Sequence, residues 1–389
     1  MEEALLTGFG HTRFGRLDGE DLESLLRQAG QLALADAGIS APDVDLVVVA
    51  NYNHGFVAQG FAAGLAGLID EGLRYKPSFH VESACATGSA AIHLGVQAIK
   101  AGEARTVLVV GAERMSHLSA QAAGNVLLSA SYVADREAEV AGGFAGAFAA
   151  IADRYAERFG DPSLACAMIA SKNHRNGLAN PLAQLRRDYD VAFCHTPSAQ
   201  NPLVAGRLRR TDCSPISDGA AAVVLMAGPQ AAGKPAVRFR ARAHVTDLMP
   251  VARRDMSQLE GCRCAWQQAL EQAGATLDDL DLVETHDCFT IAELMQYEAM
   301  GLTPPGQGVR ALDEGWVQRD GRLPVNVSGG LKSKGHPIGA TGISMHIMAS
   351  LQLLGRAGEL QLARPELAGV FNMGGMGVSN YVSVLERAQ

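Results

Sequence analysis

The sequence predicts an α/β protein built from two similar halves, and three observations support this fold class. Short apolar runs typical of buried strands, at 46–50, 106–110 and 220–226, alternate with Ala/Leu-rich segments of helical spacing. A segment of the first half is repeated in the second. Each half also carries a Gly/Ser/Thr-rich turn that leads into a helix of small residues, after Glu82 and after Ser328.

The repeat is the most specific of these observations. Residues 34–50 (LADAGISAPDVDLVVVA) align with residues 270–286 (LEQAGATLDDLDLVETH) without a gap. Each copy predicts a helix, a glycine stop, a turn and a strand, with Gly38 and Gly274 where a helix ends in a left-handed residue. The last strands of the two halves correspond more loosely.

These matches predict the domain organisation. We expect one half at residues 1–229 and the other at 236–389, joined by a Gly/Ala-rich linker. Residues 116–210 have no counterpart in the repeat, so we interpret them as an insertion that caps the first half. Within it we expect a helix at 141–155 and a polar loop at 172–189.

Composition excludes several classes of protein. Of the 389 residues 48% are hydrophobic, which favours a globular chain, and the net charge of −8 without a basic run argues against nucleic-acid binding. The longest uncharged stretch, 46–69, is broken by polar residues and glycines, so we interpret it as strand, loop and helix rather than a membrane span. Seven cysteines and an acidic N-terminus without a signal peptide predict a reducing, cytoplasmic location.

Cys85 is the first candidate for chemistry. An apolar strand reaches it and a small-residue helix follows at once, which places the thiol at a helix N-terminus. Unpaired backbone N–H groups and the helix dipole there are expected to lower the thiol pKa and to donate to an oxyanion. A buried structural cysteine is the alternative.

His336 is the second candidate. It lies in a glycine-rich turn, between Gly335 and Pro337, and a neutral imidazole held there can take the proton of a nearby thiol. A plain turn would account for the same residues. The glycines do not have the spacing of a phosphate-binding P-loop.

Two further segments follow predicted strands. His286 and Cys288 come directly after the repeated strand, where ligands gather in α/β sheets, and the first half has neither residue at that place. Metal binding by this pair competes with a catalytic role, but no zinc-like quartet accompanies them, so no metal is expected. The glycines of 371–377 allow backbone N–H groups to approach a ligand, or form a tight turn.

Taken in chain order, five motifs resemble the thiolase superfamily, and within it thiolases of the sterol-carrier-protein type. They are SACATGSA at 83–90, GAERMS at 111–116, KNHRNGLANP at 172–181, HDCF at 286–289 and GGLKSKGHPIGATG at 329–342. The resemblance implies a thiolase fold, in which two pseudo-repeated β-α-β-α-β-α-β-β halves form five layers, α-β-α-β-α, with the active site between them.

The resemblance also implies roles for the site residues. Cys85 would be the nucleophile that becomes acylated, His336 would activate it, and His286 would join His336 at a first oxyanion site. The backbone N–H groups of Cys85 and Gly374 would form a second oxyanion site.

One position departs from the classical pattern. Classical thiolases use a second cysteine in a C-terminal Cys-x-Gly loop, and Asn372 stands at that position here. The sterol-carrier type is similar in lacking that cysteine and having one in the HDCF motif, so Cys288 is expected to be the acid/base. Asn372 and Phe289 are expected at the oxyanion and substrate site.

The implied activity is cleavage of a 3-ketoacyl-CoA by coenzyme A, or the reverse Claisen condensation, through an acyl-Cys85 intermediate. Coenzyme A would be a co-substrate, with no other cofactor, and the enzyme a homodimer or tetramer. Two alternatives stay open: a decarboxylating condensing enzyme or acyltransferase that works with a small partner subunit, and a non-catalytic scaffold subunit.

The substrate is not encoded in any single residue. Phe144 and Phe148 are candidates for an apolar pocket wall, although their spacing is equally that of core residues of a helix. Five basic residues could meet the phosphates of coenzyme A or form a solvated surface: Lys172, His174, Arg175, Arg186 and Arg187.

Overall fold

Nine strands form one mixed sheet in the order β3-β2-β4-β7-β1-β8-β11-β10-β9. The computed structural model describes residues 2–52, 55–135 and 142–388. The first five strands in this order belong to the N-terminal half and the other four to the C-terminal half. Their bounds are Ala4–His11 (β1), Leu46–Ala50 (β2), Ser78–Val81 (β3), Thr106–Glu113 (β4), Gly219–Ala227 (β7), Val237–Thr246 (β8), Leu282–Glu284 (β9), Leu367–Gly374 (β10) and Ser379–Arg387 (β11).

The repeat seen in the sequence is present in the fold. The order β2-β4-β7-β1 of the first half corresponds to β9-β10-β11-β8 of the second, and the two groups meet where β1 pairs antiparallel with β8. Helices α1 (Leu22–Ala37) and α7 (Glu260–Ala273) end at Gly38 and Gly274, whose φ angles of 64° and 58° are both left-handed. In both copies, the turn that follows is closed by an aspartate, Asp43 or Asp279, that accepts from a backbone N–H three residues earlier.

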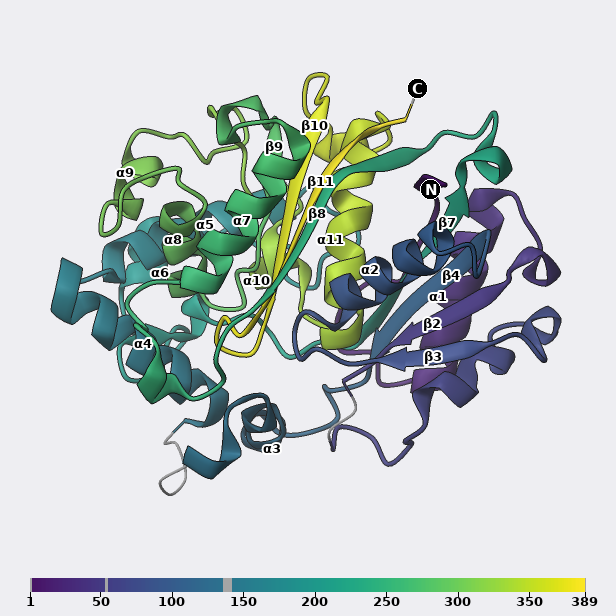
Figure 1. Cartoon of the computed structure of the whole chain (residues 1–389). Coiled ribbons are helices and arrows are strands. Elements are labelled where there is room, and N and C mark those ends of the chain that lie inside the picture. Colours follow the sequence, from purple (N-terminus) through teal and green to yellow (C-terminus); the bar gives the residue numbers. More distant parts are fainter. Residues whose placement is uncertain (1, 53–54, 136–141, 389) are drawn as a thin grey trace.

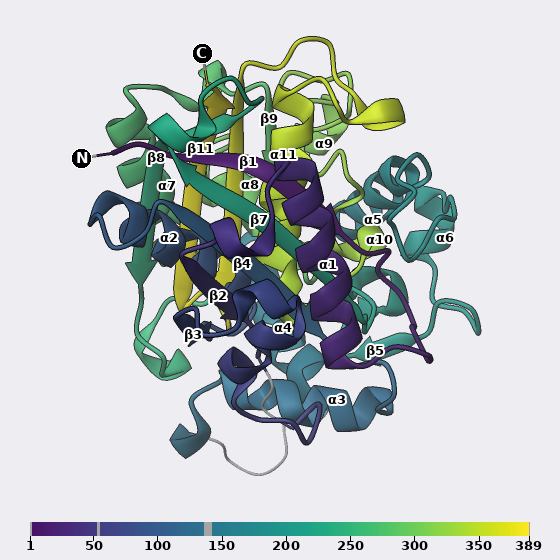
Figure 2. The same cartoon turned by 90° about the vertical axis from the view of Figure 1, so that its right-hand side faces the viewer.

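Helices and strands alternate in five layers. Helices α2 (Thr87–Lys100) and α11 (Ile338–Leu353) lie between the strands of the two halves, while α1 covers the outer face of one group and α7 that of the other (Figures 1 and 2). The central helices touch through their glycines. A Cβ atom on Gly88 would lie 2.7 Å from the nitrogen of Ile343, so only glycine allows this approach. The predicted fold class is therefore confirmed.

The insertion between β4 and β7 is mostly helical. It contains α3 (Ala120–Leu127), α4 (Gly143–Phe159), α5 (Ser163–Gly177), α6 (Val191–His195) and the short strands β5 (Leu203–Ala205) and β6 (Leu208–Arg209). The helix expected at 141–155 is α4, although Ala141 lies outside the described residues. The predicted polar loop is wrong for residues 172–177, which belong to α5.

The reason for this error lies in the partners of the α5 side chains. Asn176 donates its side-chain amide to the carbonyl of Asn326 in the other half, over 3.0 Å. Polar side chains on α5 are therefore buried against the C-terminal half, where they form hydrogen bonds. A polar segment is typical of an exposed loop, which is why the sequence predicted a loop where the structure has a helix. The remaining helices of that half are α8 (Thr290–Ala299), α9 (Gly308–Asp313) and α10 (Gly330–Lys334).

The expectation for 46–69 is met in part: β2 comes first and a 3-10 helix covers Ala62–Leu68, while Asn53 and His54 lie outside the described residues. No helix in the described part of the chain is both long enough and apolar enough to cross a bilayer.

Candidate active site

Cys85 lies in the tight loop between β3 and α2. The residue before it, Ala84, has a left-handed φ of 47°, which is uncommon for a residue with a Cβ. The backbone N–H of Ser83 donates to the hydroxyl of Thr87, which closes the loop over 2.8 Å. Cys85 thus precedes the first turn of α2, as expected, and its side chain is buried.

The expected lowering of the Cys85 pKa is wrong. Burial raises the pKa of the thiol to about 12, and the negative charge of Glu82 adds to this effect, while a backbone hydrogen bond from Gly375 opposes it. The desolvation of a buried thiolate outweighs the favourable helix terminus. The resting residue is therefore a neutral thiol that needs a base.

His336 follows α10 and is held in place from both sides. Its backbone N–H donates to the hydroxyl of Ser217 over 2.9 Å. The Thr341 hydroxyl donates to the carbonyl of Pro337 over 2.8 Å, so it accepts from His336 Nδ1 over 2.7 Å. This network assigns the proton to Nδ1 and leaves a lone pair on Nε2.

The imidazole of His336 is neutral at physiological pH. Burial, together with the positive charge of Lys334, lowers its pKa to about 3. Among the described residues, Nε2 of His336 has no hydrogen-bond partner. A buried lone pair beside a neutral thiol is the arrangement of a general base.

His286 lies two residues after β9, and α8 holds its backbone. The backbone N–H of His286 donates to Oε1 of Gln296 over 2.9 Å, and Nε2 of Gln296 donates back to the His286 carbonyl over 2.7 Å. The rings of His286 and His336 are 5.2 Å apart and nearly perpendicular. Burial lowers the pKa of His286 well below its ordinary value, and His336 contributes to this shift.

The fold brings three of the predicted residues together. The thiol sulfur of Cys85 and one ring nitrogen each of His286 and His336 lie within 4.8 Å of one another. They come from loops of both halves, far apart in the sequence. A Cys-His-His group of this spacing has the donor atoms that zinc prefers, and the expectation that the site works without a metal stays a prediction.

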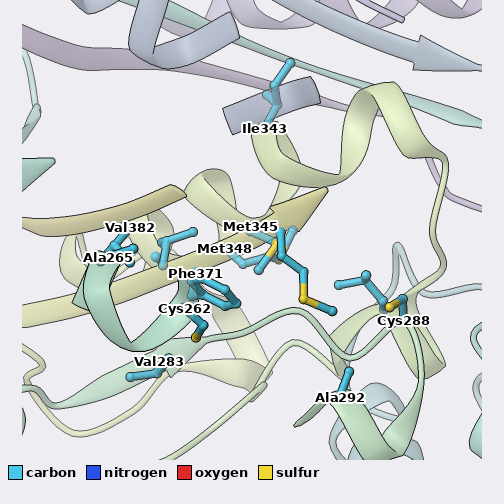
Figure 3. Close-up of a cluster of buried hydrophobic side chains, with 14 of the residues drawn as sticks. Cys262, Ala265, Val283, Cys288, Ala292, Ile343, Met345, Met348, Phe371 and Val382 are labelled. Atoms are coloured by element: carbon cyan, nitrogen blue, oxygen red, sulfur yellow. The ribbon is translucent and has the colours of Figure 1, made fainter. Parts of the chain in front are cut away.

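Cys288 and Phe289 line a cavity of about 440 Å³ together with Cys85 and His336. Cys288 also belongs to the large hydrophobic cluster of the core, where Figure 3 shows it apart from Cys262. Burial raises the pKa of the Cys288 thiol well above its ordinary value, and the neighbouring Cys85 adds to the effect. A thiol in this position is neutral and can donate a proton.

The aromatic wall of this cavity comes from Phe144 of α4 and from Phe289 of the HDCF motif. Phe289 stacks on Phe148 of α4, with ring centroids 4.4 Å apart, and Phe144 lines the cavity beside them. Phe148 is 1% exposed and also belongs to the core. Phe144 therefore meets both interpretations, since it packs in the core and lines the cavity, whereas Phe148 packs in the core against Phe289 and does not itself line the cavity.

Asn372 and Gly374, both on β10, lie against the Cys85 loop. The side-chain nitrogen of Asn372 donates to the Cys85 carbonyl over 3.0 Å and lies 2.9 Å from Nδ1 of His286. A Cβ atom on Gly374 would stand 2.2 Å from the carbonyl oxygen of Ser83. The oxyanion roles of Asn372 and Gly374 stay predictions.

Two of the basic residues expected near phosphate groups are buried instead. Lys172 is 2% exposed and pairs with Glu293 over 2.9 Å, and its Nζ also donates to the carbonyl of Val325. His174 is 1% exposed. Both interpretations, phosphate contact and a solvated surface, are wrong for these two residues because their polar atoms face the protein interior. Arg175, Arg186 and Arg187 are exposed, and their contact with phosphate groups stays a prediction.

Two positioning residues were missed by the sequence analysis. The carboxylate of Asp287 accepts from the backbone N–H groups of Leu331 (2.6 Å) and Lys332 (3.0 Å), which ties the loop of His286 to the helix before His336. The position of Asp287 between His286 and Cys288 was a signal in the sequence that could have identified it. No feature of the sequence pointed to Gln296, ten residues after His286.

Comparisons with known proteins match both halves of the chain to one family. Residues 3–189 match the family described as "Thiolase, N-terminal domain", and residues 243–387 match "Thiolase C-terminal domain-like". "Acetyl-CoA acetyltransferase" of Methanothermobacter thermautotrophicus is 34% identical over the whole of both chains. "Sterol carrier protein 2" of Homo sapiens is 32% identical over 96% of this chain and 70% of that protein.

Solved structures share the fold. The "Ltp2-ChsH2(DUF35) aldolase" matches with a TM-score of 0.81 at 21% identity, covering 99% of this chain and 98% of that one. A monomeric "SCP2-thiolase like protein type 1" from Mycobacterium smegmatis matches with a TM-score of 0.75 at 19% identity, covering 99% and 77%. The chain belongs to the thiolase superfamily, in its sterol-carrier-protein type, and is an acyltransferase.

Proposed function

We propose that this protein is a thiolase that cleaves 3-ketoacyl-CoA with coenzyme A, and that it also catalyses the reverse Claisen condensation. The observation that carries this proposal is the meeting of Cys85, His286 and His336 within 4.8 Å, where Cys85 and His336 line a cavity together with Cys288. Acyl transfer through a cysteine needs a nucleophile, a base and donors for an oxyanion, and this group supplies candidates for each.

In the first half of the reaction, the Cys85 thiol gives its proton to Nε2 of His336. The thiolate attacks the 3-keto carbon, and the bond between C2 and C3 then breaks. Cys85 keeps the acyl group as a thioester, and the enolate of the departing acetyl-CoA takes a proton from the thiol of Cys288. Each hydrogen bond to such an oxyanion is worth about 3 kcal/mol.

In the second half, coenzyme A gives its thiol proton to the Cys288 thiolate and attacks the acyl-Cys85 thioester. The new acyl-CoA leaves, and the Cys85 thiolate recovers its proton from His336. Both thiols and the imidazole are then back in their starting states. The condensation direction reverses these steps, with Cys288 removing the α-proton of acetyl-CoA.

The test is loss of 3-ketoacyl-CoA absorbance on addition of coenzyme A, with short, long and branched substrates. Cys85→Ala is expected to abolish cleavage and acylation, while Cys288→Ala abolishes cleavage but still forms an acetyl-enzyme, detected by intact mass. Cys262→Ala is the control, since Cys262 is a buried cysteine of the same core cluster that does not line the cavity. Absence of cleavage by folded wild type would refute the proposal.

A partner-dependent reaction is the second candidate. The observation that favours it is the similarity in fold to a solved aldolase whose name joins two proteins, Ltp2 and ChsH2(DUF35). A decarboxylating enzyme generates its carbanion without a base, so it would not need Cys288. Activity that appears only after a small partner subunit is added, and that survives Cys288→Ala, would favour this candidate over the thiolase.

A further inference from the structure

We propose that Asn372 is a positioning residue: it fixes the ring proton of His286 on Nε2 and thereby makes His286 a hydrogen-bond donor toward the reacting groups. Its effect on catalysis rests on the proposed thiolase function. The tautomer itself does not, because it follows from the hydrogen bonds around Asn372.

The orientation of the Asn372 amide is fixed by two partners other than His286. Its Oδ1 accepts from the hydroxyl of Ser89 over 2.8 Å, and its Nδ2 donates to the carbonyl of Cys85 over 3.0 Å. A carbonyl oxygen can only accept, so the nitrogen of the amide must face Cys85. A flipped amide would place two oxygens against each other.

The second hydrogen of Nδ2 then faces His286. Nδ1 of His286 lies 2.9 Å from Nδ2 of Asn372, and an amide nitrogen has no lone pair to accept with. Nδ1 must therefore be the acceptor. Because burial keeps His286 neutral, its single ring proton is on Nε2.

Nε2 of His286 is the atom left for the reaction. It is completely buried, has no hydrogen-bond partner among the described residues, and belongs to the ring that approaches Cys85 and His336. An unpartnered buried N–H costs free energy unless a ligand accepts from it. A thioester or enolate oxygen of the substrate is the acceptor that the chemistry supplies there.

The two histidines of the site are thereby made different. The hydroxyl of Thr341 places the proton of His336 on Nδ1 and leaves Nε2 as a base, whereas Asn372 places the proton of His286 on Nε2. One imidazole can accept the thiol proton while the other donates to an oxygen. The same tautomer opposes metal binding, since a protonated Nε2 has no lone pair for a metal ion.

The first test measures the tautomer in the wild-type enzyme. In protein labelled with ¹⁵N-histidine, His286 is expected to show an unprotonated Nδ1 and a protonated Nε2 at neutral pH, with His286→Gln used to assign its signals. A protonated Nδ1, or an equal mixture of tautomers, would overturn the proposal whether or not the enzyme proves to be a thiolase.

The second test uses variants. Asn372→Leu is expected to lower kcat about 10²-fold, the loss seen for one oxyanion donor, with little change in the KM for the acyl-CoA, and to mix the His286 tautomers. Asn372→Asp, whose carboxylate accepts from Nδ1–H, is expected to move the signal of Nδ1 toward the protonated form. An unchanged spectrum in both variants would show that Asn372 does not set the tautomer.

The matched control is Asn380→Leu. Asn380 is a buried asparagine of the neighbouring strand β11, and its amide donates to the carbonyl of Gly377 rather than to a site residue. This variant is expected to keep the wild-type His286 tautomer. If Asn372→Leu does not fold, Ser89→Ala gives a second readout, because it removes only the donor to Oδ1 and is expected to loosen the tautomer preference.

Discussion

Gly374 lies in backbone contact with Ser83: a Cβ atom on Gly374 would stand 2.2 Å from the Ser83 carbonyl oxygen. This contact joins the last strand hairpin of the C-terminal half to the loop that carries Cys85. A glycine is required because no Cβ fits against a backbone oxygen at that distance.

Gly374→Ala is therefore expected to displace the Cys85 loop. Acylation of Cys85 by acetyl-CoA, followed by intact mass, should fall to background, and the free energy of unfolding should drop by about 1–3 kcal/mol, as for an overpacked core. Gly228→Ala is the control, since nothing lies within 4 Å of a Cβ there. Normal acylation in Gly374→Ala would show that the loop tolerates the extra atom.

Thr341→Val should weaken the general base. The substitution preserves shape but removes the oxygen that accepts from His336 Nδ1, so the proton is free to move to Nε2. The single-turnover rate of Cys85 acetylation is expected to fall roughly 10²-fold, the lower range of general-base effects. Thr341→Ser keeps the hydroxyl and should stay near the wild-type rate; equal losses in both variants would contradict this role.

Phe148→Ala should change the choice of substrate. Phe148 packs against Phe289, which lines the cavity, so removing the Phe148 ring should let Phe289 move into the vacated space. The wider cavity should raise kcat/KM for bulkier acyl chains relative to acetoacetyl-CoA. The lost burial should also cost about 3–5 kcal/mol of stability. Phe159→Ala, on the same helix but packed on Tyr155 rather than on Phe289, should keep the wild-type preference. A preference that stays constant in Phe148→Ala would assign this residue to the core alone.

The resemblance to thiolases implies a dimer built partly from the strand before the Cys85 loop, and we propose that this enzyme is a homodimer that pairs through that strand, β3. This strand is an edge of the sheet, and the side chain of its Phe79 is 54% exposed. An exposed edge strand favours pairing with another chain, because its backbone hydrogen-bonding groups have no partner on that side. Sedimentation should give a dimer for wild type and a monomer for Phe79→Asp. Leu32→Asp, an exposed position on α1, should remain dimeric. A monomeric wild type would refute this arrangement.

Stability should fall as the pH is lowered below 6.5. Burial lowers the pKa of His11 and His336 to about 3 and that of His346 to about 4, so the unfolded chain binds their protons first. Each such histidine lowers the free energy of unfolding by about 1.4 kcal/mol for every pH unit between 6.5 and its pKa in the folded protein. Asp287, with its pKa raised to about 7, acts in the opposite direction.

In this pH range, the histidines with a lowered pKa outnumber the carboxyl groups with a raised pKa. The free energy of unfolding should therefore fall as the pH falls. Urea unfolding at pH 7, 6 and 5 measures it, with His11→Gln expected to flatten the slope. A midpoint that is constant or rises toward pH 5 would contradict the neutral, buried state of these imidazoles.

Local sequence patterns were sufficient for the architecture. The glycine stops at Gly38 and Gly274, the apolar strand runs and the small-residue helices are set by short-range preferences, and their repetition predicted two halves. The loops that carry Cys85, His286 and His336 were found for the same reason, because each follows a recognisable strand or turn.

The tertiary structure decided what those residues can do. The pKa of Cys85, the burial of Lys172 and the proton position on His286 depend on groups that only the fold brings together, such as Asn372 beside Cys85. The sequence by itself thus determined the halves, the loops and the types of side chain at the site. Desolvation and hydrogen-bond geometry, which arise only when the chain is folded, determined the charge state and proton location of each group.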